Sequence, residues 1–242
     1  MPTPTPPPFA LHHRTEHGRP WPFLVWRFDR PRRVISSAPV GGGIGERSWV
    51  LNAQVRSGYD RVDLDGHVDD LAAAVGLPTG TGVGLLTAAD VSGAVPAVDG
   101  DVEVVATVGI RVPTWAAAPA DRPDAVLVPG AAPVPAAPGT INIVALIPVP
   151  MSDAALVNLV ATATEAKTQA LFDAAIPGTG TATDAVCVVC PVVDHGAGPE
   201  PFGGPRSVWG ARLARATYDS VRAGIGGSLR IIAGTADDGG PA

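Results

Sequence analysis

The sequence predicts an α+β layered domain, in which about three helices pack on a mainly antiparallel or mixed sheet. Short runs rich in Val, Ile and Leu are separated by turn residues, as strands are, and only three stretches carry helix signals. Several of the strands follow one another without a helix between them. Because a parallel pair needs a long crossover connection, consecutive strands favour antiparallel pairing over a doubly wound parallel sheet.

The predicted elements run in the order strand, strand, helix, strand, strand, strand, helix, strand, helix. The strands are expected at residues 23–28, 33–37, 82–88, 102–110, 141–148 and 184–190, and the helices at residues 63–77, 153–175 and 208–223. These elements form a single domain over residues 22–235, between a disordered, Pro-rich tail at residues 1–21 and a second tail at residues 236–242.

Apolar runs and turn residues justify the first half of this order. The first two strands are FLVWRF and RVISS, and an Asp and a Pro between them favour a turn at residues 29–31. The first helix ends at a glycine and a proline. Residues 113–138 are dominated by Ala, Pro and Asp, which predicts an exposed excursion between two strands.

Helix 153–175 has the clearest helix signals in the chain. Ser152 can cap its first turn, Asp153 complements the helix dipole, and a Pro-Gly pair ends it. Its apolar stripe consists of Leu156, Val160, Ala163, Ala170, Leu171 and Ala174.

Lys167 lies inside that apolar stripe, whereas Glu165 lies on the opposite side of the helix. The polar stripe around Glu165 also contains Asn158, Thr162 and Gln169. Two interpretations stay open: a solvent-facing helix with one snorkelling lysine, or a helix that contributes Lys167 or Glu165 to a cleft.

A loop of small and hydroxylated residues follows this helix at residues 178–184. Thr179, Thr181 and Thr183 offer three hydroxyls, and the loop ends with the carboxylate of Asp184. Such a loop can aim backbone N–H groups and hydroxyls at a carbonyl oxygen or an anion. A Gly/Thr connector without a chemical role is the ordinary alternative.

Further polar residues stand at or near the ends of apolar runs. They are Asn52, Thr87, Asp90, Thr140 and Asn142. Sites on layered folds often use such positions, although capping and turn roles are commoner. Gly42 and Gly43 permit a ligand or another backbone to approach closely, or make a turn.

Composition and charge exclude several classes of function. The net charge of −6 argues against binding to a nucleic-acid backbone, and no apolar run approaches the roughly 18 residues that span a bilayer. Without a secretory pattern at the amino terminus, a cytoplasmic protein is expected. Cys187 and Cys190 point to opposite faces of a strand and are expected to be buried structural residues. Neither a metal nor a cofactor is predicted.

Eight short blocks stand out when the chain is taken as a whole. They are RVISSA at residues 33–38, GGGIG at 41–45, WVLN at 49–52, GLLTAADV at 84–91, TVG at 107–109, GTINI at 139–143, ATEAKT at 163–168 and GTATDA at 180–185. In this order they resemble the adenosylcobinamide amidohydrolase family of cobamide salvage. The resemblance implies hydrolysis of the amide that joins the corrin-ring propionate to aminopropanol in adenosylcobinamide, giving adenosylcobyric acid.

Two mechanisms are compatible with this implied reaction. In the first, Thr181 or Thr183 is the nucleophile or a donor, Asp184 orients or deprotonates it, and Lys167 donates a proton or stabilises charge. In the second, Glu165 activates a water while Asn52 and Asn142 donate to the carbonyl.

The implied substrate is a small-molecule corrinoid, and its predicted binding positions are small and polar residues. They are Gly42, Gly43, Asn52, Thr87, Asp90, Thr140 and Asn142. Trp49, Tyr59 and Trp115 are candidates for an apolar platform under the ring, and each is equally compatible with filling the core. Two rival functions are a non-catalytic corrinoid-binding protein and a small-amide hydrolase or acyltransferase on the same fold. A homo-oligomer stays open.

Overall fold

The computed structural model describes residues 9–16, 18–119, 139–193 and 198–237, with side chains up to residue 227. Within these residues, eight strands form one sheet. They are β1 (Phe9–Glu16), β2 (Arg19–Ser36), β3 (Gly43–Gln54), β4 (Gly82–Thr87), β5 (Val95–Asp99), β6 (Val102–Gly109), β7 (Thr140–Leu146) and β8 (Ala185–Cys190). The helices are α1 (Leu64–Ala74), a 3₁₀ turn η1 (Val91–Gly93), α2 (Asp153–Asp173) and α3 (Val208–Asp237).

The sheet bends so that its two ends face each other. Its order is β4-β3-β2-β8-β7-β6-β5, with β1 paired to β2, and the pairs β3–β4 and β7–β8 are parallel while the others are antiparallel. Asn52 on β3 donates a hydrogen bond to Thr107 on β6, although three strands separate them in that order. The mixed sheet and its helices confirm the predicted α+β layered fold.

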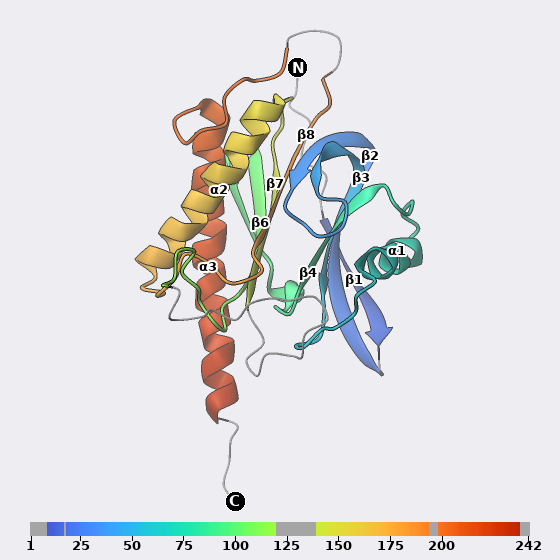
Figure 1. Cartoon of the computed structure of the whole chain (residues 1–242), viewed down its shortest axis with the longest axis vertical. Helices are drawn as coiled ribbons and strands as arrows, with labels where there is room; N and C mark the ends of the chain where they lie inside the picture. Colours follow the sequence, from blue (N-terminus) through green and yellow to red (C-terminus); the bar gives the residue numbers. More distant parts are fainter. Residues whose placement is uncertain (1–8, 17, 120–138, 194–197, 238–242) are drawn as a thin grey trace, which may run out of the picture.

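Side chains alternate between the two faces of each strand and so build three apolar clusters. The inner cluster fills the space between the two halves of the sheet, with Leu24, Val50 and Leu85 from one half and Val105 and Val144 from the other. Outside this double layer, α2 and α3 cover β6–β8, and α1 covers β3 and β4 (Figure 1).

Strand β2 holds the two halves together. The sequence predicts two strands with a turn at residues 29–31, but the structure has one strand whose register with β3 shifts between Arg27 and Arg32. Before this irregularity β2 pairs with β1, and after it β2 pairs with β8. A bulge bends and twists a strand, so the residues expected to reverse the chain instead carry it from one half of the sheet to the other.

Three strands were not predicted, because long-range pairing overrides their local composition. Strand β1 lies in the segment expected to be a tail and covers the edge of β2 with one half-buried face. Strand β3 begins in the glycine-rich stretch expected to be a loop, and β5 contains a proline. Of the predicted excursion, residues 120–138 lie outside the described residues.

The helices begin within one residue of the predicted positions. Asp63 caps α1, and the Ser152 hydroxyl accepts a hydrogen bond from the Ala155 N–H at 3.1 Å. Helix α3 continues to Asp237, well beyond the predicted end at residue 223. The glycine after that position does not end the helix but permits close packing, since a Cβ on Gly224 would lie 2.6 Å from Val108 Cγ2. No described helix has both the length and the apolar character needed to cross a membrane.

Candidate active site

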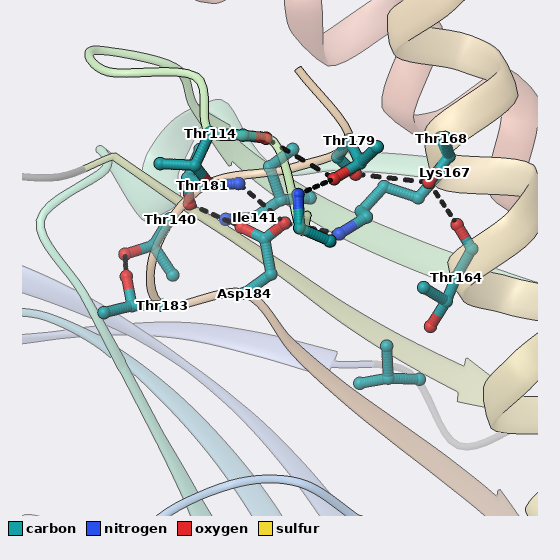
Figure 2. Close-up of polar contacts among 12 residues, drawn as sticks. Thr114, Thr140, Ile141, Thr164, Lys167, Thr168, Thr179, Thr181, Thr183 and Asp184 are labelled. Atoms are coloured by element: carbon teal, nitrogen blue, oxygen red, sulfur yellow. Dashed lines mark hydrogen bonds and ion pairs between the residues drawn. The ribbon is translucent and has the colours of Figure 1, made fainter. Parts of the chain in front are cut away.

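Asp184 is the centre of a polar cluster at the start of the parallel strands β7 and β8 (Figure 2). Its Oδ2 atom accepts from Lys167 Nζ at 2.5 Å and from the Thr181 N–H at 3.0 Å. Its Oδ1 atom accepts from Thr181 Oγ1 at 2.5 Å and from the Ile141 N–H at 2.8 Å. One carboxylate therefore ties together α2, the loop after α2, and the first turns of two strands.

Lys167 reaches this carboxylate from the buried side of α2. Its side chain is 8% exposed and that of Asp184 is 11% exposed. The apolar stripe that contains Lys167 does face the core, with Leu156, Ala163 and Leu171 fully buried. Lys167 does not snorkel to solvent but forms an ion pair within the protein, and a buried ammonium needs such a partner.

Gly180 lets these charged groups meet. A Cβ at this position would lie 2.3 Å from Asp184 Oδ2 and 2.6 Å from Lys167 Nζ. The loop that carries Thr181 therefore passes so close to the ion pair that a larger residue than glycine does not fit without displacing it.

Gly180→Ala is expected to lower the free energy of unfolding by about 1–3 kcal/mol, because the added methyl group separates Lys167 from Asp184. Urea denaturation measures this change. Gly204→Ala is the matched control, since a Cβ at Gly204 meets no atom within 4 Å. Equal stability of the two variants would contradict the close packing of the loop on the ion pair.

The structure distinguishes the two threonines that the sequence left as alternatives. Thr181 Oγ1 bonds a carboxylate oxygen, whereas Thr183 Oγ1 donates to the Gly139 carbonyl at 3.0 Å. Thr183 also lies 2.6 Å from Thr140 Oγ1, so Thr140 is the donor in that pair. A hydroxyl beside a carboxylate can lose its proton to it, and only Thr181 of these two has that arrangement.

A second polar group lies inside the double sheet. Asn142 Nδ2 donates to Asn52 Oδ1 at 2.9 Å, and Asn52 Nδ2 donates to Thr107 Oγ1 at 3.1 Å. All three residues are 1% exposed. Ala185 faces the inner cluster, and Lys167 reaches the preceding residue, Asp184, from α2 on the outer face, so the buried group and the Asp184 carboxylate lie on opposite faces of the sheet.

The other predicted site residues do not join either group. Glu165 is exposed on the solvent side of α2. Of the second mechanism, the structure therefore brings Asn52 and Asn142 together in the buried group and leaves Glu165 apart from them. Thr87 Oγ1 accepts from the Ala89 N–H, and Asp90 caps η1. Gly42 and Gly43 lie at the turn between β2 and β3. A Cβ on Gly42 would lie 2.3 Å from the Ala38 carbonyl oxygen.

The three candidate platform residues have different surroundings. Trp49 is 1% exposed and packs against Gly82. Tyr59 stacks on His67, and its hydroxyl lies 2.5 Å from the His67 Nδ1 atom. His67 is buried, and this burial lowers its pKa. Trp115 alone of the three is exposed, at 54%.

The cysteines lie on opposite faces of β8, as predicted. Cys187 is in the inner cluster and Cys190 in the cluster under α2 and α3, and both are free. Burial raises the pKa of Cys187 to about 12 and that of Cys190 to about 11. No three His, Cys, Asp or Glu side chains within the described part of the chain could hold a metal ion together.

Several partners in the cluster were not predicted from the sequence. The Ile141 N–H is a backbone group and leaves no residue signature. Thr168 Oγ1 donates to the Thr179 carbonyl, and Thr179 and Gly180 form backbone hydrogen bonds with Thr114. The spacing of Thr164 and Thr168 along α2 could have suggested a hydroxyl-bearing face.

Residues 8–231 match the model of a protein family described as adenosylcobinamide amidohydrolase. The chain belongs to the adenosylcobinamide amidohydrolase family. A relative from Halobacterium salinarum, itself named adenosylcobinamide amidohydrolase, is 40% identical over 158 residues, which are 65% of this chain and 64% of the relative's length. The family predicted from the sequence is confirmed, and its name describes enzymes that hydrolyse amide bonds.

A solved structure, that of the PH0078 protein from Pyrococcus horikoshii OT3, is also similar to this adenosylcobinamide amidohydrolase family member. The TM-score is 0.43 and the sequence identity 12%, over 91% of this chain and 84% of that chain. Similarity at this level carries no information about the reaction.

Proposed function

We propose that this chain hydrolyses the amide between the corrin-ring propionate and aminopropanol in adenosylcobinamide, and that the adenosylcobyric acid released serves cobamide salvage. The observation that supports this most is the unbroken hydrogen-bonded series from Lys167 through Asp184 to Thr181. Family membership supports adenosylcobinamide as the substrate, since the description of the family names this molecule and an amide hydrolase.

The proposed first step forms an ester on Thr181. The Thr181 hydroxyl oxygen attacks the amide carbon and gives its proton to Asp184 Oδ1, with which it already shares a hydrogen bond of 2.5 Å. The carbon–nitrogen bond then breaks, and the nitrogen takes the proton and leaves as aminopropanol.

The proposed second step releases the acid. A water molecule gives a proton to Asp184 and attacks the ester carbon, and the Thr181 oxygen takes that proton back as the acid departs. In both steps negative charge develops on the carbonyl oxygen. The ammonium of Lys167 lies beside the reacting groups and stabilises this charge, and the low exposure of the ion pair strengthens the effect.

Incubation of the protein with adenosylcobinamide, followed by mass spectrometry, tests the proposal. We expect adenosylcobyric acid and aminopropanol in equal amounts. Binding of adenosylcobinamide without either product would contradict hydrolysis and favour a corrinoid-binding protein. Hydrolysis of small amides with adenosylcobinamide left intact would contradict the substrate and favour a general amide hydrolase.

The remaining partner predictions stay predictions. The proposed substrate is a small corrinoid molecule, and no binding to nucleic acid is part of the proposal. A cytoplasmic location and a homo-oligomer also stay predictions.

A further inference from the structure

Two exposed aromatic side chains lie beside the loop that carries Thr181. Among the described residues, the exposed apolar aromatics are Trp115 at 54%, Phe172 at 78% and Phe202 at 69%. Only 5% of the chain is aromatic, and its other large aromatics include Trp26 and Trp49 in the core. Exposed aromatic side chains on two sides of one loop can provide apolar surface for a ligand.

The backbone on both sides of Trp115 is hydrogen-bonded to the loop that carries Thr181. The Thr114 N–H donates to the Gly180 carbonyl at 2.9 Å, and the Thr179 N–H donates to the Thr114 carbonyl at 2.8 Å. On the other side, the Ala116 N–H donates to Thr179 Oγ1 at 2.9 Å. The backbone around the indole is therefore fixed to the loop one residue before Thr181, as Figure 2 shows for Thr114 and Thr179.

Phe172 reaches the same loop from α2. The Thr168 hydroxyl donates to the Thr164 carbonyl within α2 at 2.9 Å and also lies 3.2 Å from the Thr179 carbonyl oxygen. Phe172 follows Thr168 by four residues, so the two side chains lie on the same face of the helix, one turn apart. Thr179 is thus contacted by Thr168 and by Ala116, and each of these residues has an exposed aromatic side chain close by.

Phe202 lies elsewhere. It precedes Gly203, where a Cβ would lie 2.2 Å from the Ala155 carbonyl oxygen in the first turn of α2. Thirteen residues separate Ala155 from Thr168, which is roughly 20 Å along a helix. This third aromatic is a matched control for the other two.

We propose that Trp115 and Phe172 form the binding surface for the apolar face of the corrin macrocycle. The inference rests on the proposed function for the identity of the ligand. A large conjugated ring gains free energy by covering exposed aromatic side chains. Because the segment with Trp115 is bonded to the residue before Thr181, a ring on this surface can extend an amide side chain toward the Thr181 hydroxyl.

Equilibrium dialysis of cobinamide, followed by its visible absorbance, tests this surface without requiring hydrolysis. We expect Trp115→Ala to weaken binding roughly tenfold and Phe172→Ala severalfold. Trp115→Phe keeps an aromatic ring and is expected to bind within about threefold of the unaltered chain, while Phe202→Ala binds equally. In steady-state kinetics, Trp115→Ala is expected to raise KM with kcat unchanged.

The outcomes separate this inference from the proposed function. If the unaltered chain binds cobinamide through Trp115 but releases no product from adenosylcobinamide, the proposed hydrolysis is contradicted and the proposed binding surface is supported. If the chain hydrolyses adenosylcobinamide and Trp115→Ala binds and reacts as before, the surface alone is wrong. The binding surface is also contradicted if the unaltered chain does not bind cobinamide. The same holds if Trp115→Ala changes only the oligomeric state, as measured by sedimentation.

Discussion

Asp184→Asn is expected to lower the free energy of unfolding by about 3–5 kcal/mol and to abolish turnover. The Lys167 side chain is only 8% exposed, and the substitution removes the negative partner of its ammonium group. The new amide also turns either an NH₂ group or a neutral oxygen toward the four donors that Asp184 accepts from. An unpaired buried charge is among the most destabilising changes in a folded protein. Urea denaturation measures the first effect, and product formation from adenosylcobinamide the second.

Lys167→Met is the matched variant and is expected to be less destabilising. Asp184 then keeps three donors, which are the Thr181 hydroxyl and N–H and the Ile141 N–H. The double variant Lys167→Met with Asp184→Asn has no charge left at this site, so it is expected to be more stable than Asp184→Asn alone yet equally inactive. Asp184→Asn with the stability of the unaltered chain would contradict the buried ion pair.

Thr181→Ala is expected to lower turnover about a thousandfold or more, because it removes the atom that attacks the amide. Stability should fall by only about 1–3 kcal/mol, since one hydrogen bond to a carboxylate is lost while the backbone N–H of residue 181 still donates to Asp184. The rate of adenosylcobyric acid release, measured on protein shown to be folded by circular dichroism, checks this prediction.

The parts of the site that depend on local sequence could be predicted. The cap at Ser152 and the apolar periodicity of α2 place Lys167 on the buried face, and the loop that contains Thr181 and Asp184 follows α2 directly. Helix periodicity and short loops act over few residues, so their signals are complete within the segment that forms them.

The parts that depend on strand pairing could not be predicted. The Ile141 N–H reaches Asp184 only because β7 and β8 are parallel neighbours, with Asn142 opposite Ala185. Nothing in residues 139–143 alone states which strand lies beside them. The same holds for Asn52 and Asn142, which meet because the sheet bends back on itself.

The burial of Trp49 depends on the register in which β3 pairs with β4. From sequence it could lie under the substrate or in the core. The structure pairs it with Gly82 on β4, and a Cβ on Gly82 would lie 2.0 Å from the Trp49 ring. A glycine that far away in the sequence gives the indole its space, so the burial of Trp49 follows from a contact that periodicity does not reveal.

The rate ratio between Thr181→Ser and Thr181→Ala tests the central claim most directly, with Thr183→Ala as the control. The rates of adenosylcobyric acid formation by the three variants and by the unaltered chain are measured at saturating adenosylcobinamide. If Thr181 is the nucleophile beside Asp184, the serine variant keeps a hydroxyl and reacts within about tenfold of the unaltered chain. The alanine variant then loses turnover, and Thr183→Ala keeps it. Full turnover by Thr181→Ala would show that the attacking oxygen belongs to another group.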